Sequence, residues 1–309
     1  MKPIELKVSL FVPTHNPASI LIAGLADSIR DRSGGTLLLQ VSHGEVHGTT
    51  AEQYDLARTG AVDIAYFIHS ATPGRFPLSE IATLPPVGDP IAATAALQRL
   101  SATYLAPEYA GVKLLFLTAN TPMAIHAAVP VRSLEDFKGL RIGHTGRVVA
   151  ATLEALGATP VNIPPLQIRA ALTSGTIDAS SMTYEAALVL RLADLTRFSY
   201  ELNANTITFG LAMNAQRHAS LEPPQRLMID EVLGASAGLR LAQALADAAD
   251  EGRQYMRGAG VLLVTPSDTD KVALAGIAKS VSTAFITKLM GGNLPGRTVF
   301  DALKTSLQH

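Results

Sequence analysis

The sequence predicts an α/β protein of two similarly built lobes, and three observations carry this prediction. Residues 57–65 read Ala-Arg-Thr-Gly-Ala-Val-Asp-Ile-Ala, and residues 172–180 read Leu-Thr-Ser-Gly-Thr-Ile-Asp-Ala-Ser. In both phrases a helix-like run ends at a glycine, which fits the left-handed position past a helix end, and an aspartate leads into a strand. The length of 309 residues is enough for about two domains. Strand-like and helix-like segments also alternate, which is typical of mostly parallel sheets flanked by helices.

The first lobe begins with an alternation of strands and helices. Residues 5–12, 36–42 and 62–68 are strand-like, and Asn16 followed by Pro17 predicts the start of the first helix. Ligands of such sheets bind at the carboxyl ends of the strands. This rule places several side chains near a prospective site: Thr14, His15, Asn16, Tyr66, Phe67 and His69.

The second lobe begins near Met123 and repeats this alternation. A strand at 206–214 returns to the first lobe, and the Ala- and Leu-rich stretch 223–258 predicts a long helix, interrupted at Gly234 and Gly238. Two crossings between lobes make a hinge, and the space between the lobes is a cleft in which a small molecule can bind.

Composition excludes several classes of function. The formal net charge of −1 gives no support for nucleic acid as a partner. The absence of cysteine excludes disulfides, Cys–zinc sites and a thiol nucleophile. His43, Glu45 and His47 form the one metal-like cluster, but Gly44 and Gly48 indicate a loop there. No nucleophile elbow or phosphate-binding loop is present, so we expect no metal, no cofactor and no enzymatic activity.

The N-terminus lacks a recognisable targeting signal. Residues 1–5 have no apolar run and lead directly into a strand. We therefore expect either a cytosolic protein or a sequence that begins at the mature N-terminus. No transmembrane helix is expected, because the longest uncharged stretch, 114–131, contains Asn120, Pro122 and Pro130.

Six phrases, in order and spacing, resemble the substrate-binding proteins of tripartite ATP-independent periplasmic (TRAP) transporters, of the dicarboxylate-binding type. The resemblance spans nearly the whole chain. It implies a type II-like, two-lobed periplasmic receptor, a monomer, that closes on a small organic acid and delivers it to the membrane subunits of a TRAP permease. The phrases are 52–60 (EQYDLARTG), 73–78 (PGRFPL), 134–142 (LEDFKGLRI), 156–161 (LGATPV), 175–178 (GTID) and 213–214 (MN).

The resemblance also implies a division of the chain. Lobe I takes residues 1–122 plus 210–250, and lobe II takes residues 123–209 plus 251–309, with the long helix bracing both lobes and the ligand cleft between them.

Three positions depart from the family pattern. The family follows Gly-Leu-(Lys/Arg)-Ile with an arginine that clamps the ligand carboxylate, and that position is Gly143 here. Arg141 matches a different, structural basic position. Where the family often has a second arginine this chain has Met123, and where the family commonly has an asparagine this chain has Met182. We therefore expect a less charged ligand than a dicarboxylate, most simply an apolar or aromatic monocarboxylate.

Other side chains are candidates to contact that ligand. His144 and Arg147 lie at the start of the helix over 147–156, whose N-terminus attracts anions, and either can supply the missing charge. We expect Glu185 to be an exposed carboxylate at a helix start, and the alternative is that it faces a cation. A neutral or cationic ligand, or an enzyme or sensor on the same scaffold, remain alternatives. The aromatic candidates for the pocket wall are Tyr66, Phe67, Tyr184 and Phe209.

Overall fold

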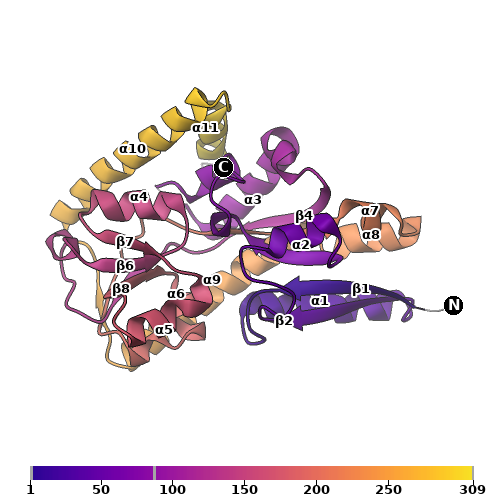
Figure 1. Cartoon of the computed structure of the whole chain (residues 1–309), viewed down its shortest axis with the longest axis horizontal. Helices are drawn as coiled ribbons and strands as arrows, with labels where there is room; N and C mark the ends of the chain where they lie inside the picture. The colour runs from indigo at the N-terminus through magenta and orange to yellow at the C-terminus, as the bar shows by residue number, and fades with distance from the viewer. Residues whose placement is uncertain (1–2, 86–87, 308–309) are drawn as a thin grey trace.

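The computed structural model describes residues 3–85 and 88–307 and has two lobes, each built on its own sheet (Figure 1). In lobe I the strand order is β2-β1-β3-β10-β4, and in lobe II it is β11-β9-β5-β8-β6-β7. The lobe I strands are β1 (Ile4–Leu10), β2 (Leu37–His43), β3 (Ile64–Ile68), β4 (Val112–Ala119) and β10 (Thr208–Asn214). The lobe II strands are β5 (Ala124–Ala127), β6 (Arg141–His144), β7 (Thr159–Asn162), β8 (Ala179–Met182), β9 (Phe198–Tyr200) and β11 (Leu262–Val264).

Each sheet is parallel except for one strand. β10 runs antiparallel to both its neighbours in lobe I, and β5 runs antiparallel to both its neighbours in lobe II. Each reversed strand is the one that the chain enters after crossing from the other lobe. The chain crosses between the lobes after β4 and again before β10, and these two crossing segments pair with each other. Asn120 N–H donates to the Ile207 carbonyl oxygen, and Met123 N–H donates to the Asn205 carbonyl oxygen. These paired segments are the two crossings between the lobes that the sequence predicts.

Helices cover the sheets, and α9 and α10 extend along both lobes (Figure 1). Their bounds are α1 (Pro17–Arg32), α2 (Gln53–Thr59), α3 (Pro90–Leu100), α4 (Arg147–Ala155), α5 (Ile168–Thr173), α6 (Tyr184–Val189), α7 (Ala215–Ala219), α8 (Pro223–Val232), α9 (Ala235–Gly258), α10 (Asp268–Gly291) and α11 (Gly296–Ser306).

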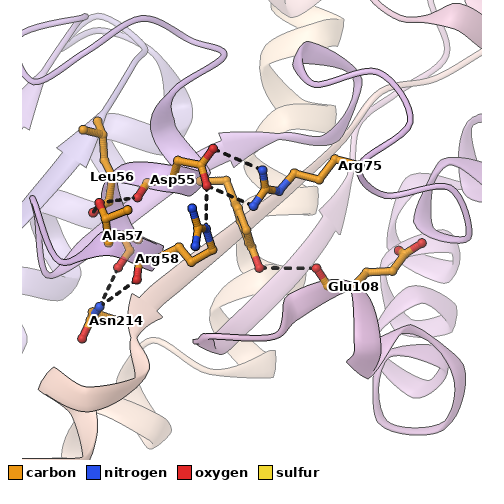
Figure 2. Close-up of polar contacts among 9 residues, drawn as sticks. Asp55, Leu56, Ala57, Arg58, Arg75, Glu108 and Asn214 are labelled. Atoms are coloured by element: carbon orange, nitrogen blue, oxygen red, sulfur yellow. Dashed lines mark hydrogen bonds and ion pairs between the residues drawn. The ribbon is translucent and has the colours of Figure 1, made fainter.

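The repeated phrase forms the same joint in each lobe, and Figure 2 shows the helix end that it follows in lobe I. Gly60 ends α2 with φ of 80°, as predicted. Asp63 then accepts a 2.7 Å hydrogen bond from the backbone N–H of Lys7 in β1. Asn214 at the end of β10 donates from Nδ2 to the carbonyl oxygens of Ala57 and Arg58, at 2.9 and 3.2 Å. The joint therefore fastens α2 to the sheet.

In lobe II the joint follows α5. Gly175 has φ of 69°, and Asp178 accepts a 2.9 Å hydrogen bond from the backbone N–H of Arg141 in β6. The Arg141 side chain also donates to both carboxylate oxygens of Asp178, at 3.0 and 2.6 Å. This pairing lowers the pKa of Asp178, with the side-chain hydrogen bond as the largest cause. Arg141 is thus a structural residue, as the resemblance implies.

α9 is the expected brace between the lobes. Leu241 and Leu245 belong to the hydrophobic core of lobe I, whereas Ala249 and Met256 belong to a core cluster of lobe II. The predicted helical stretch over 223–258 is interrupted at Gly234, as expected, whereas Gly238 lies inside α9. The brace is therefore α9 alone, which touches both lobes.

The C-terminal helices differ from the expected assignment of 251–309 to lobe II. β11 does join the lobe II sheet, but α11 packs on α3 of lobe I, where Val299, Phe300 and Leu303 cover Leu97. These three residues follow helical spacing, and their apolar stripe is buried against lobe I. By length and composition alone α10 is apolar enough to cross a membrane, but it packs against α4 and α11.

Candidate functional site

A cleft lies between the lobes, at the carboxyl ends of strands from both sheets. Residues that follow β1, end β3, follow β6 and end β8 meet there, as the strand-end rule predicts. The residues that line it are Phe11, Val12, Pro13, Asn16, Ile68, Asn120, Met123, Thr145, Pro165, Leu166, Ser181, Met182, Thr183, Glu185, Ala186, Val189, Leu190, Ile207 and Phe209.

The wall of the cleft is mostly apolar. Thirteen of its nineteen lining residues are apolar, and two of these, Phe11 and Phe209, are aromatic. The Phe209 ring stacks on Tyr66, with ring centroids 5.3 Å apart, and Tyr66 stacks on Phe11 at 5.5 Å. Tyr66 itself is buried behind this wall. Phe11 and Phe209 therefore form the aromatic part of the lobe I wall, and Tyr66 supports both rings from behind.

Glu185 is the only ionisable residue among the lining residues, and it is only 4% exposed. Its Oε1 accepts a 2.7 Å hydrogen bond from Asn16 Nδ2 of lobe I. Its Oε2 accepts from Asn120 Nδ2 and Thr183 Oγ1, each at 3.3 Å. Burial raises the pKa of this carboxyl, against the lowering effect of the three hydrogen bonds. The expectation of an exposed carboxylate at this position is therefore wrong.

Arg147 makes an ion pair between the lobes instead of lining the cleft. Its Nε donates to Glu80 Oε2 at 2.5 Å, and Glu80 lies in a short 3-10 helix of lobe I (Ser79–Thr83). The guanidinium carbon lies 4.7 Å from the Phe285 ring centroid of α10. Glu80 is buried, and burial raises the pKa of its carboxyl although Arg147 lowers it. Arg147 and Glu80 therefore form an ion pair that links the two lobes.

The comparisons with known proteins agree with this architecture. Residues 8–288 match the family model of bacterial extracellular solute-binding proteins, family 7. The chain belongs to this family. Its members are solute-binding proteins, which argues against the enzyme alternative.

Solved relatives share the whole fold of this solute-binding protein. A TRAP solute-binding protein from Rhodoferax ferrireducens, solved with copurified benzoate, is 26% identical with a TM-score of 0.94 and covers 99% of this chain and 98% of its own. A Bordetella bronchiseptica TRAP periplasmic protein with bound mandelate is 24% identical with a TM-score of 0.91, over 99% of both chains. A solute-binding protein from Albidiferax ferrireducens is 25% identical over an alignment of 192 residues, and the match covers 57% of this chain and 53% of that relative. The match thus spans about half of the latter protein.

The predicted site residues of this solute-binding protein separate into three groups. Met123, Met182 and Phe209 line the cleft. Thr14 and His15 are exposed at its rim, where His15 Nε2 lies 3.4 Å from the Val189 carbonyl oxygen of α6 in the opposite lobe. The remaining candidates, Tyr66, Phe67, Gly143, His144, Arg147 and Tyr184, are placed outside the lining residues.

The physical reasons for these placements differ. Phe67 follows Tyr66 in β3, so it faces the opposite side of the sheet and packs on Tyr54 and Phe76. Tyr184 lies beneath the Arg253 guanidinium of α9, 4.7 Å from its ring centroid. These rings are therefore core residues, and they are not part of the ligand wall.

Lobe II encloses the segment that was expected to replace the family arginine. A Cβ atom at Gly143 would lie 2.7 Å from Ile177 and 2.8 Å from Ile168, so this position faces the core of lobe II. His144 is buried, with Nδ1 3.1 Å from the Gly146 carbonyl oxygen, and burial lowers its pKa. The next residue, Thr145, is the one that reaches the cleft.

Four of the six polar lining residues were not predicted from the sequence, because they belong to no recognisable motif: Asn120, Thr145, Ser181 and Thr183. Asn16 was expected near the site and as the cap of α1. Its Oδ1 does accept from Ala18 N–H at 2.9 Å, and its Nδ2 donates to Glu185. Asn120 lies in a crossing segment, and no local pattern marks it. His43, Glu45 and His47 have separate partners, and no cluster of metal-binding side chains occurs within residues 3–85 and 88–307.

Proposed function

We propose that this protein is an extracytoplasmic receptor that binds an apolar or aromatic monocarboxylic acid in the cleft between its lobes. The observation that carries the proposal is the composition of the cleft: a mostly apolar wall, with an aromatic surface on one side and a few polar groups around Glu185. A small amphipathic molecule with one polar end suits such a wall, because apolar lining gives affinity and the few polar groups give orientation.

The relatives support an aromatic acid as the ligand. Benzoate copurified with the Rhodoferax ferrireducens protein, and mandelate is bound in the Bordetella bronchiseptica protein. Both molecules have one ring and one carboxylate. We infer that Phe11 and Phe209, supported by Tyr66 behind them, receive a planar or apolar ligand group in this protein as well.

Dicarboxylates are expected to bind poorly. Among the described lining residues none is Lys, Arg or His, so a second ligand carboxylate would lose its water without gaining a cationic partner. The lack of a bidentate arginine contact in a buried site costs on the order of a few kcal/mol. The family positions at Met123 and Met182 contribute apolar surface here, which favours one carboxylate over two.

We further propose that the receptor is a periplasmic monomer that closes on its ligand and delivers it to the membrane subunits of a TRAP permease. The hinge of paired crossing segments and the Arg147–Glu80 contact support closure as the ligand-linked change. Unchanged small-angle scattering at saturating ligand would count against closure, and a dimer in light scattering would count against the monomer.

One observation favours a second candidate, a neutral or cationic ligand. Glu185 brings a buried carboxyl and no cation to the cleft, and an ionised carboxylate there would attract an amine. The two candidates differ in the sign of the ligand charge, so one panel of compounds separates them.

The test is a thermal-shift and calorimetry panel containing benzoate, cyclohexanecarboxylate, succinate and neutral ring alcohols. A ligand that binds only the folded state raises the melting temperature. We expect a shift with benzoate or cyclohexanecarboxylate and none with succinate. Ala186→Trp fills the cleft and should abolish the shift, whereas Ile20→Trp at an exposed position of α1 should not. Binding of succinate, or of alcohols alone, contradicts the proposal.

A further inference from the structure

The Glu185 carboxyl has one acceptor position that no donor from residues 3–85 and 88–307 fills. A carboxyl group offers about four lone-pair positions. Asn16, Asn120 and Thr183 each donate one hydrogen bond to it, and Glu185 also lines the cleft. The three donors hold the carboxyl in one place, and the remaining position is available to a ligand atom.

In the part of the chain that the structure describes, no cation from the elements packed around Glu185 forms an ion pair with it. From β3, the titratable neighbour is Tyr66, whose pKa is raised well above its usual value by burial and, secondarily, by Glu185. From the loop before α1, His15 lies at the rim beside Val189. From α9, which packs on α6, Arg253 pairs with Glu201. The remaining nearby cation, Arg147, is paired with Glu80.

An ionised acid bound beside an ionised Glu185 would place two negative charges in a site without a cation. Two carboxyl groups in such a site do not both ionise, and they retain one proton between them. Burial already raises the pKa of Glu185 in the absence of ligand, which makes the proton easier to retain.

We propose that Glu185 binds the ligand carboxylate through one shared proton, so that each acid molecule enters the cleft together with a proton. This inference rests on the proposed function, because it requires an acid as the ligand. The proton comes from the solvent and lies between an oxygen of Glu185 and an oxygen of the ligand, and no other bond forms or breaks. Glu185 would thus replace a cationic clamp by a hydrogen bond between two carboxyl groups.

The consequence is a binding constant that depends on pH with a defined sign. Benzoate is ionised above about pH 5, so any proton taken up there belongs to the pair of carboxyl groups. Above the pKa of free Glu185, Kd should increase about tenfold for each pH unit. Below that pKa Glu185 already carries the proton, and Kd should become independent of pH.

The experiment is calorimetry of benzoate binding in two buffers of different ionisation enthalpy, between about pH 5.5 and 8.5. We expect about one proton to be taken up per ligand at the alkaline end. Glu185→Gln keeps a hydrogen-bond donor without a titrating group, so it should bind benzoate with no proton uptake and a flat pH profile. Glu154→Gln, at an exposed position of α4, should keep the wild-type profile.

Each outcome decides the inference. Benzoate binding with no proton uptake and a flat wild-type Kd up to pH 8.5 overturns the inference that each acid molecule enters with a proton, and it leaves the proposed function intact. Binding of benzylamine in place of benzoate, lost in Glu185→Gln, overturns both and assigns Glu185 to a cationic ligand. If none of the acids binds at any pH, the shared proton and the proposed function are both overturned. The proton count on the wild-type protein needs no variant, so it decides the inference even if Glu185→Gln fails to fold.

Discussion

The two lobes share one frame and differ where they face the cleft. In each lobe a left-handed glycine ends a helix, and an aspartate three residues later accepts the backbone N–H of the adjacent strand: Asp63 from Lys7, and Asp178 from Arg141. In each lobe one reversed strand follows a crossing of the chain. The sequence repeat therefore corresponds to a repeat of hydrogen bonds.

The cleft-facing ends of the lobes carry different chemistry. Lobe I contributes the rings of Phe11 and Phe209, whereas lobe II contributes Glu185, held by Asn16 from the opposite lobe. In this fold, therefore, the residues that build the helix-to-strand joints differ from the residues that face the ligand cleft. One lobe presents an apolar surface and the other presents a titratable group, so only a closed cleft brings the two together.

The largest effect that tests this comparison is acid destabilisation, because both lobes bury histidines whose pKa is lowered: His69 in lobe I, and His126 and His144 in lobe II. Burial lowers the pKa of His69 in lobe I and of His126 in lobe II to about 4. A histidine with a depressed pKa stabilises the folded state above pH 6.5, and this stabilisation is lost as the pH falls toward 4. Each contributes up to about 3 kcal/mol over this window.

Urea unfolding at pH 7 and at pH 4.5 measures this loss. His69→Gln and His126→Gln should each reduce the loss between the two pH values, although both variants lose hydrogen bonds at neutral pH. His47→Gln, at an exposed site, is the control and should leave the loss unchanged. If only one of the variants His69→Gln and His126→Gln reduces the loss of unfolding free energy, the two lobes do not contribute equally to acid destabilisation.

The second effect concerns the brace, which approaches each lobe at a glycine. A Cβ at Gly238 would lie 2.7 Å from the Leu117 carbonyl oxygen of lobe I, and one at Gly252 would lie 2.1 Å from that of Tyr184 in lobe II. We expect Gly238→Ala and Gly252→Ala each to reduce the free energy of unfolding by about 1–3 kcal/mol. Gly258→Ala in the same helix meets no atom within 4 Å and should be neutral or slightly stabilising. Equal melting temperatures for all three variants would contradict the close approach.

The third effect sharpens the role of the contact between lobes. Arg147→Ala leaves the buried carboxyl of Glu80 without its ionic partner, at a cost of about 1–3 kcal/mol to the closed arrangement. We expect a larger radius of gyration in small-angle scattering and weaker ligand binding. Lys271→Ala removes an exposed pair with Asp268 and should change neither property measurably. A compact Arg147→Ala protein with unchanged affinity would show that the contact does not hold the lobes.

The smallest effect compares the two joints directly. Asp63→Asn and Asp178→Asn each weaken hydrogen bonds to a backbone N–H and to an arginine, which we expect to cost about 1 kcal/mol in unfolding free energy. Because Arg141 lowers the pKa of Asp178, its stabilisation exists above pH 3.8 and is lost as the pH falls below that value. The difference between wild type and Asp178→Asn should therefore vanish in acid. A difference that does not decrease as the pH falls below 3.8 would contradict the ionic origin.

The frame was predictable from the sequence because its signals are local. The glycine and aspartate of each joint, the Asn16 cap and the crossing segments all lie within a few residues of the elements they define. The phrases that carry the family resemblance also have structural roles: Asp55 pairs with Arg58 and Arg75, and Asn214 fastens α2 (Figure 2).

The cleft was only partly predictable because its contacts are distant in the sequence. Glu185 meets Asn16 from 169 positions away, and Arg147 meets Glu80 from 67 positions away. Neighbouring Tyr66 and Phe67 point to opposite faces of β3, and the sequence does not indicate which face turns toward the cleft. α11 returns to lobe I although it lies at the end of the chain, since only tertiary packing decides which lobe its apolar stripe covers.

The measurement that tests the central claim most directly is calorimetry of benzoate against benzylamine. Both compounds carry the same ring, and they differ in the sign of their charge. The account predicts a saturable isotherm with benzoate, lost in Ala186→Trp, and no heat of binding with benzylamine. A saturable isotherm with benzylamine and none with benzoate would contradict it and would make the protein a receptor for cations.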